Sequence, residues 1–128
     1  MVDRRQLVLG TTLLSLLGGA PAVGADAPHE SYGSVGRIKA KPGRRDALAA
    51  LVIGATSGMP GCRAYVVSED LGDPDALWVF EAWDSKAAHD ASLSLPAIRE
   101  AIAKGRPLIA QFDNGAELRV LSMATGAG

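Results

Sequence analysis

Alternating and continuous apolar runs, separated by stretches of helical periodicity, divide residues 32–123 into six predicted elements. Four runs predict strands: YGSVGRIKA (32–40), GCRAYVVSED (61–70), ALWVFEAWD (76–84) and AELRVLSM (116–123). Two stretches place alanine, leucine and isoleucine at helical spacing and predict amphipathic helices over 44–58 and 86–104. The segment 106–115 is predicted to be a connection.

Glycine, proline and capping residues mark where these elements end. Pro42-Gly43 is turn chemistry after the first strand, and Gly58 with Pro60 ends the first helix. The turn LGDPD between the second and third strands makes them an antiparallel hairpin. Ser85 is a predicted N-cap, and Pro96 breaks the second helix or starts it again.

The order β-α-β-β-α-β predicts an α+β domain of the ferredoxin-like, split βαβ type, with both helices on one face of a four-stranded antiparallel sheet. The run 76–84 is apolar on both faces, because Trp78 and Phe80 point one way and Val79 and Trp83 the other. A half-solvated sheet alternates apolar with polar residues, so the face without helices needs a cover. We predict a homodimer packed through the face that carries Trp78 and Phe80.

The first 25 residues predict a signal peptide. A short charged start precedes an uncharged segment whose apolar centre, 7–17, has the length of a signal-peptide core, and small residues precede Asp26. Arg4-Arg5 resembles a twin-arginine signal, with a general secretion signal and an uncleaved anchor as alternatives. The predicted organisation is a signal over 1–25, a polar lead-in over 26–33, a domain over 34–122 and a flexible tail over 123–128. The protein would then be exported, periplasmic or secreted, in a bacterium.

Composition narrows the classes of function. The chain has 128 residues, 48% of them hydrophobic, 21% charged, with a net charge of −1, which suits one globular domain and gives no basic excess for binding nucleic acid. Cys62 is the single cysteine, so it has no intramolecular disulfide partner and is either buried and inert or reactive. The spacing shows no metal-ligand cluster, no glycine-rich phosphate loop and no Ser-His-Asp set.

Three titratable residues are candidates for proton chemistry. Glu81 lies on an apolar strand face and would act as a base or an orienting group, or simply pair with Arg119 or Arg37. His89, near the start of the second helix, has the titration range for proton transfer, or is a half-exposed helix residue. Tyr65 would donate its hydroxyl to a substrate or fill the core.

Several motifs together resemble the antibiotic biosynthesis monooxygenase family, which includes small quinol monooxygenases. They are Lys41-Pro42-Gly43, Pro60-Gly61-Cys62 followed by Tyr65, Asp73-Pro74 and Glu81-x-Trp83, within a resemblance that covers 34–121. The resemblance implies a dimeric α+β barrel that oxidises a small aromatic substrate, a phenol or quinol, with O2 and without flavin, haem or metal. The resemblance also implies that Trp83 forms a wall of the substrate pocket and that Glu81 or His89 accepts the proton of the substrate.

The chain departs from the family pattern at two positions that would contact substrate. The histidine common nine residues after the tryptophan is Ser92 here, and an asparagine that some members place four residues before it is Val79. Haem-degrading relatives have catalytic residues at three positions that are Gly36, Ser92 and Ile102 here, and these side chains cannot perform that reaction. The predicted site therefore has His89 and Glu81 as catalytic residues and Trp83, Tyr65, Val79 and Ser92 as substrate-binding residues, without a metal or cofactor. The alternative function is a non-catalytic dimer on the same scaffold that binds a small molecule.

Overall fold

The computed structural model describes residues 31–124 and 126 of the chain. The predicted signal peptide, most of the lead-in and part of the tail lie outside the described residues. The elements are β2 (Tyr32–Ala40), α2 (Arg45–Ala55), β3 (Cys62–Glu69), β4 (Ala76–Trp83), α3 (Lys86–Ser92), α4 (Pro96–Gly105), the 3-10 turn η3 (Arg106–Leu108) and β5 (Ile109–Arg119). The first strand begins at Tyr32, two residues before the predicted domain boundary.

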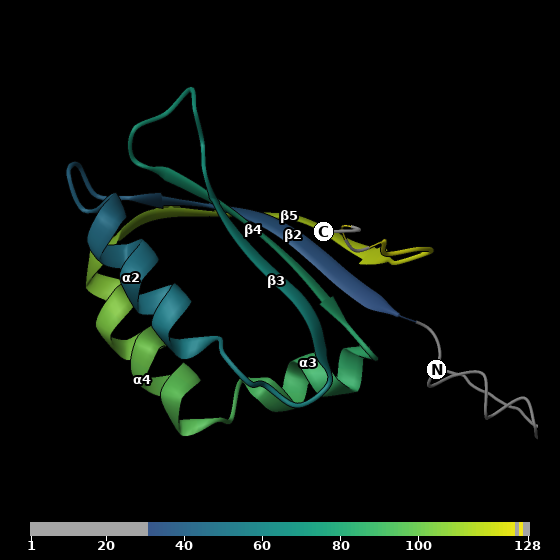
Figure 1. Ribbon diagram of the computed structural model, residues 1–128. Coiled ribbons are helices and arrows are strands. Elements are labelled where there is room, and N and C mark those ends of the chain that lie inside the picture. The colour runs from purple at the N-terminus through teal and green to yellow at the C-terminus, as the bar shows by residue number, and fades with distance from the viewer. Residues whose placement is uncertain (1–30, 125, 127–128) are drawn as a thin grey trace, which may run out of the picture. The chain divides into compact units, whose positions relative to one another are not determined.

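The four strands form one sheet in the order β3-β4-β2-β5, and every neighbouring pair is antiparallel. The three helices all lie on one side of this sheet, as Figure 1 shows. This arrangement confirms the predicted α+β, ferredoxin-like fold, with the second predicted helix divided in two. Strands β4 and β2 are central, so residues on them are flanked by the sheet on both sides.

The last strand corrects the sequence prediction, because residues 109–115 belong to β5 and not to a connection. Strand β5 pairs along the whole of β2, from Tyr32 opposite Arg119 to Ala40 opposite Ile109. The register shifts between Val35 and Gly36, where Gly115 approaches the Val35 carbonyl too closely for any side chain. Such a bulge interrupts the alternation of faces, and this interruption hid the first half of the strand in the sequence.

Local capping explains where the helices begin. The Ser85 hydroxyl accepts a hydrogen bond from the backbone N–H of Ala88 at 3.1 Å, which confirms the predicted N-cap of α3. Pro96 occupies the first turn of α4, where its missing N–H costs nothing, so the predicted break is the start of a new helix. Helix α2 ends at Ala55, three residues before the predicted end. No helix in the described part of the chain is long and apolar enough to cross a membrane.

The core lies between the helices and the sheet in two clusters. One joins Ala40 of β2, Leu48 of α2 and Leu77 of β4. The other joins Met59, Trp83 of β4 and Ile98 of α4, and the Trp83 side chain has no exposed surface. Between them, the helix-facing side of β4 carries Val79 and Glu81, so a carboxylate interrupts an otherwise apolar row.

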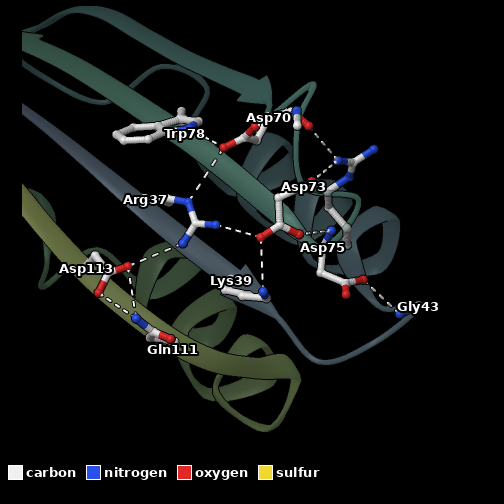
Figure 2. Close-up of polar contacts among 11 residues, drawn as sticks. Arg37, Lys39, Gly43, Asp70, Asp73, Asp75, Trp78, Gln111 and Asp113 are labelled. Carbon is white, nitrogen blue, oxygen red and sulfur yellow. Dashed lines mark hydrogen bonds and ion pairs between the residues drawn. The ribbon is translucent and has the colours of Figure 1, made fainter.

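The opposite face of the sheet carries a network of charged residues at one end. Figure 2 shows the Arg37 guanidinium between the carboxylates of Asp70, Asp73 and Asp113, with its shortest contact to Asp73 at 2.6 Å. Trp78 belongs to the same group, since its indole N–H donates to Asp70 at 2.9 Å. That hydrogen bond is the main cause that lowers the pKa of Asp70. Arg37 is therefore committed to this network and does not reach the helix-facing side of the sheet.

Candidate functional site

A cavity of about 410 Å³ opens on the helix-facing side of the sheet, between β2, β4, β5 and α3. Its walls include Tyr32, Tyr65, Val79, Glu81, His89, Phe112 and Glu117. A cavity of this size, mostly apolar with a few converging polar groups, has the form of a small-molecule site. Four of the six residues predicted from the sequence line it: Tyr65, Val79, Glu81 and His89.

Glu81 is held from below by the buried indole of Trp83. The Trp83 Nε1–H donates to the Glu81 Oε1 at 2.9 Å, two residues along the same strand face. Because an indole N–H is only a donor, Glu81 is the acceptor, and this hydrogen bond fixes the orientation of the carboxylate toward the cavity. Glu81 thus pairs with neither Arg119 nor Arg37, the two arginines that were its alternative predicted partners.

His89 lies against the other side of the same carboxylate. Its Nε2 is 3.7 Å from Glu81 Oε1, and the two side chains retain only 20% and 17% of their exposure. The imidazole also meets the Trp83 ring edge-on, with centroids 5.6 Å apart. Helix α3, which carries His89, is positioned by the Ser85 cap, so the cap indirectly sets the distance between imidazole and carboxylate.

Asp90 determines which nitrogen of His89 carries the proton. His89 Nδ1 is 2.9 Å from Asp90 Oδ1, and this hydrogen bond is the first cause that lowers the pKa of Asp90. An ionised carboxylate only accepts, so the neutral imidazole carries its proton on Nδ1 and presents a lone pair at Nε2. The Nε2 atom lies on the side of the Glu81 carboxylate, and a proton between them would be stabilised by both groups.

Tyr32 and Glu117, two further lining residues of the cavity, are joined by a hydrogen bond. The Tyr32 hydroxyl donates to Glu117 Oε2 at 2.9 Å, and its ring lies 5.2 Å from the His89 ring. Burial and this hydrogen bond raise the pKa of Tyr32 to about 12. Tyr32 therefore stays a neutral phenol near neutral pH, and its hydroxyl holds Glu117, which also contacts Lys86 at 3.8 Å.

Tyr65 forms the inner wall of the cavity as a second neutral phenol. Burial is the largest cause that raises its pKa, and the nearby Glu81 charge adds to the effect. Burial likewise raises the pKa of the neighbouring Cys62 thiol, which keeps that residue in its unreactive protonated form. Proton chemistry in this cavity therefore centres on Glu81 and His89.

A family model described as antibiotic biosynthesis monooxygenase matches residues 31–104. The chain belongs to this family. Glu81 and His89 fall inside the matched region, whereas Phe112 and Glu117 follow it on β5. Among curated proteins, no sequence matches the chain.

Solved structures of similar proteins support the family assignment. A Chloroflexus aurantiacus protein that carries the same family name is 50% identical, covering 77% of this chain and 99% of its own, with a TM-score of 0.72. A Deinococcus radiodurans protein with that family name is 27% identical over 76% of this chain and 99% of its own, with a TM-score of 0.62. The Mycobacterium tuberculosis protein Rv0793 is 25% identical over 74% of this chain and 99% of its own, with a TM-score of 0.64.

Two residues predicted to contact substrate lie outside the cavity of this monooxygenase-family chain. Trp83 is fully buried beneath Glu81 and reaches the site only through its N–H. Ser92 ends α3, where its hydroxyl donates to the His89 backbone carbonyl at 2.6 Å, and it lines a separate small groove. Both residues support the site from behind.

The structure adds four residues to the site that were not predicted from the sequence: Tyr32, Asp90, Phe112 and Glu117. Asp90 follows His89 directly in the sequence, so this acidic neighbour of a candidate base could have been recognised from the sequence. The other three depend on the pairing of β2 with β5, which places Ser34 opposite Glu117 and Ile38 opposite Phe112. Within the described residues, no group of three or more His, Cys, Asp or Glu side chains has the arrangement of a metal site.

Proposed function

We propose that the protein is a cofactor-independent monooxygenase that oxidises a quinol or another small phenol with O2. The observation that carries the proposal is the Glu81–His89 pair: a carboxylate oxygen and an imidazole nitrogen 3.7 Å apart in a half-enclosed, largely apolar cavity. A phenolic hydroxyl is a donor of the kind that either group can accept from. The family membership supports a monooxygenase reaction, and the cavity supports a small aromatic substrate.

Removal of one proton makes a quinol able to reduce O2. In the proposed reaction His89 Nε2 accepts the hydroxyl proton, and Glu81 and Asp90 stabilise the resulting imidazolium from its two sides. The quinolate passes one electron to O2, and the semiquinone and superoxide then combine through a new carbon–oxygen bond. Loss of the ring hydrogen as a proton with cleavage of the oxygen–oxygen bond releases water. Hydroquinone and O2 thus give hydroxyquinone and water, with all four electrons supplied by the substrate.

Oxygen uptake by the purified protein tests this reaction. Reduced naphthoquinols and catechols would be supplied with a chelator, without flavin and with catalase present. We expect uptake above autoxidation, one O2 consumed per hydroxyquinone formed, and no effect of catalase, because no hydrogen peroxide is released. Glu81→Gln and His89→Ala should lower the rate about 10²- to 10⁴-fold, the usual contribution of a general base.

Glu100→Gln is the matched control, because Glu100 lies on the exposed side of α4 and pairs only with Lys104. This variant should retain the full rate. Uptake at the autoxidation rate with every substrate would refute the oxygenase. If calorimetry then showed that the same quinols bind, the protein would be the non-catalytic binding dimer.

We also propose that the protein is a homodimer packed through the sheet face that lacks helices. That face exposes 40% of Trp78 and 47% of Val66 beside the half-buried Phe80. A contiguous apolar surface of this kind is costly in water, and a second copy of the same face would cover it. The Arg37 network at one end of the face would limit how the two copies align.

Phe80→Glu should convert the dimer to a monomer in sedimentation at micromolar concentration. Ile53→Glu is its control, since Ile53 is 59% exposed on α2, away from this face, and should leave the dimer intact. A Phe80→Glu protein that is folded and still dimeric would show that the copies associate elsewhere. Export to the periplasm or the medium remains our proposal for localisation, and fractionation of cells that express the full chain tests it.

A further inference from the structure

A second cavity, of about 320 Å³, lies between α2, α4 and the sheet. Its walls are largely aliphatic and include Val52, Ile98, Ile102 and Ile109. It opens at the surface beside Ile102 and Phe112, which keep 41% and 62% of their exposure. Close-packed protein cores hold few voids larger than a water molecule, so an open apolar cavity of this size is a feature of a binding surface.

The second cavity adjoins the site cavity. Ile38, Tyr65 and Phe112 line both of them, and they come from β2, β3 and β5 respectively. The two ends differ in chemistry. The first carries Glu81, His89 and Glu117, whereas the polar groups of the second are Thr56, Tyr65 and Arg106. A ligand that spans both would need a polar head and an apolar tail.

We propose that the substrate is an aromatic diol with an apolar substituent, whose ring lies at Glu81 and His89 and whose substituent occupies the second cavity. The place of the ring rests on the proposed function, whereas the subsite for the substituent rests on the second cavity itself. The charges favour an uncharged substrate, because Glu81 and Glu117 line the site cavity, and Lys86, which contacts Glu117 at 3.8 Å, is shared with Asp90. A carboxylate or sulfonate on the ring would meet the same charge.

An alkyl series measures the contribution of this subsite. Calorimetry under nitrogen would give Kd for hydroquinone and for its methyl, propyl and pentyl derivatives, so that binding is observed without turnover. Each methylene that leaves water for an apolar wall lowers Kd by up to about fourfold. We therefore expect Kd to fall steadily from the parent compound to the pentyl derivative.

Ile102→Glu is the decisive variant, because it places a carboxylate at the opening of the second cavity. The ratio of Kd between hydroquinone and pentyl hydroquinone should fall to near one. Ile53→Glu, the same substitution at an exposed position on α2 that lines neither cavity, should keep the wild-type ratio. Circular dichroism of both variants would establish that each is folded.

The result separates the two proposals. A Kd that does not change along the wild-type series would overturn the subsite, whether another part of the chain or a second copy fills the cavity. The same holds if Ile102→Glu keeps the full wild-type ratio. If binding tightens along the series but no quinol supports oxygen uptake, the subsite stands and the oxygenase fails. If short quinols are oxidised with no effect of the substituent, the oxygenase stands and the subsite fails.

Discussion

Removing the indole N–H of Trp83 should destabilise the protein much more than the same change at Trp78. Both indoles donate to a carboxylate at 2.9 Å, from Trp83 to Glu81 and from Trp78 to Asp70. Trp83 is fully buried, whereas Trp78 is 40% exposed on the opposite face. In the substitutions Trp83→Phe and Trp78→Phe, an aromatic ring remains, so the comparison measures the two hydrogen bonds, with a small cavity added at the fully buried Trp83.

The burial of each pair sets the expected magnitude. Loss of the hydrogen bond to the half-buried Glu81 carboxylate costs about 1.5–3 kcal/mol, whereas water replaces the lost donor at Asp70 and makes that loss much smaller. Trp83→Ala removes the ring as well and should cost about 3–5 kcal/mol. For a domain of this size, about 1 kcal/mol corresponds to a shift of about 4–8 °C in Tm.

Thermal and urea denaturation at one fixed protein concentration measures these differences, since association shifts the apparent stability. Equal losses in Trp83→Phe and Trp78→Phe would refute the reasoning, because burial would then have no influence on the value of the hydrogen bond. Trp83→Phe should also weaken quinol binding, since Glu81 loses the donor that orients it. A destabilised variant with unchanged affinity would show that Trp83 only fills the core.

Two further measurements test the geometry around the site. The pKa values of Tyr32 and Tyr65 are both raised, so native tyrosinate absorbance should be absent at pH 10 and present for the protein in urea. Because the folded state holds the Tyr32 proton to about pH 12, its stabilising contribution is complete below pH 10 and is lost as the pH rises from there to about 12; native tyrosinate absorbance at pH 10 would contradict this. Gly61→Ala should destabilise more than Gly58→Ala: both glycines have positive φ, which costs about 1–3 kcal/mol for alanine, but only at Gly61 would the added Cβ lie 2.7 Å from Ala88. Equal losses in urea denaturation would show that α3 moves away freely.

The sequence predicted those parts of the fold whose signals are local. The first strand, Tyr32–Ala40, matches its predicted range in full because Pro42-Gly43 marks its end within the same short segment. The Ser85 cap is equally local. Strand β5 was misjudged because its pairing with β2 is non-local and its alternation is interrupted beside Gly115. No pattern within residues 109–115 alone distinguishes that strand from a connection.

The same distinction applies to the site. Glu81 was identifiable because a carboxylate on an apolar strand face needs a partner, and His89 because its titration range suits proton transfer. The partnership of Tyr32 with Glu117 was not, because it depends on a register between strands that are far apart in the sequence. The sequence also could not show that Trp83 lies beneath the cavity, since face alternation gives the side of the sheet but not the depth.

Strand β4 has large apolar residues on both faces, whereas the register of a strand with one apolar and one polar face is fixed by that difference alone. Its register is nevertheless specified twice. A shift by one residue would exchange its faces, moving Trp83 and Glu81 away from the helices and Trp78 into the core. That shift would separate Trp83 from Met59 and Ile98, and Trp78 from Asp70, so each face opposes it independently. One face of β4 carries the Glu81 carboxylate toward a cavity, and the other carries an apolar surface. Both faces therefore tolerate substitution poorly. Its two tryptophans act alike, since each fixes a carboxylate through the only donor of its side chain: Trp83 beneath the site cavity and Trp78 on the opposite face of the sheet.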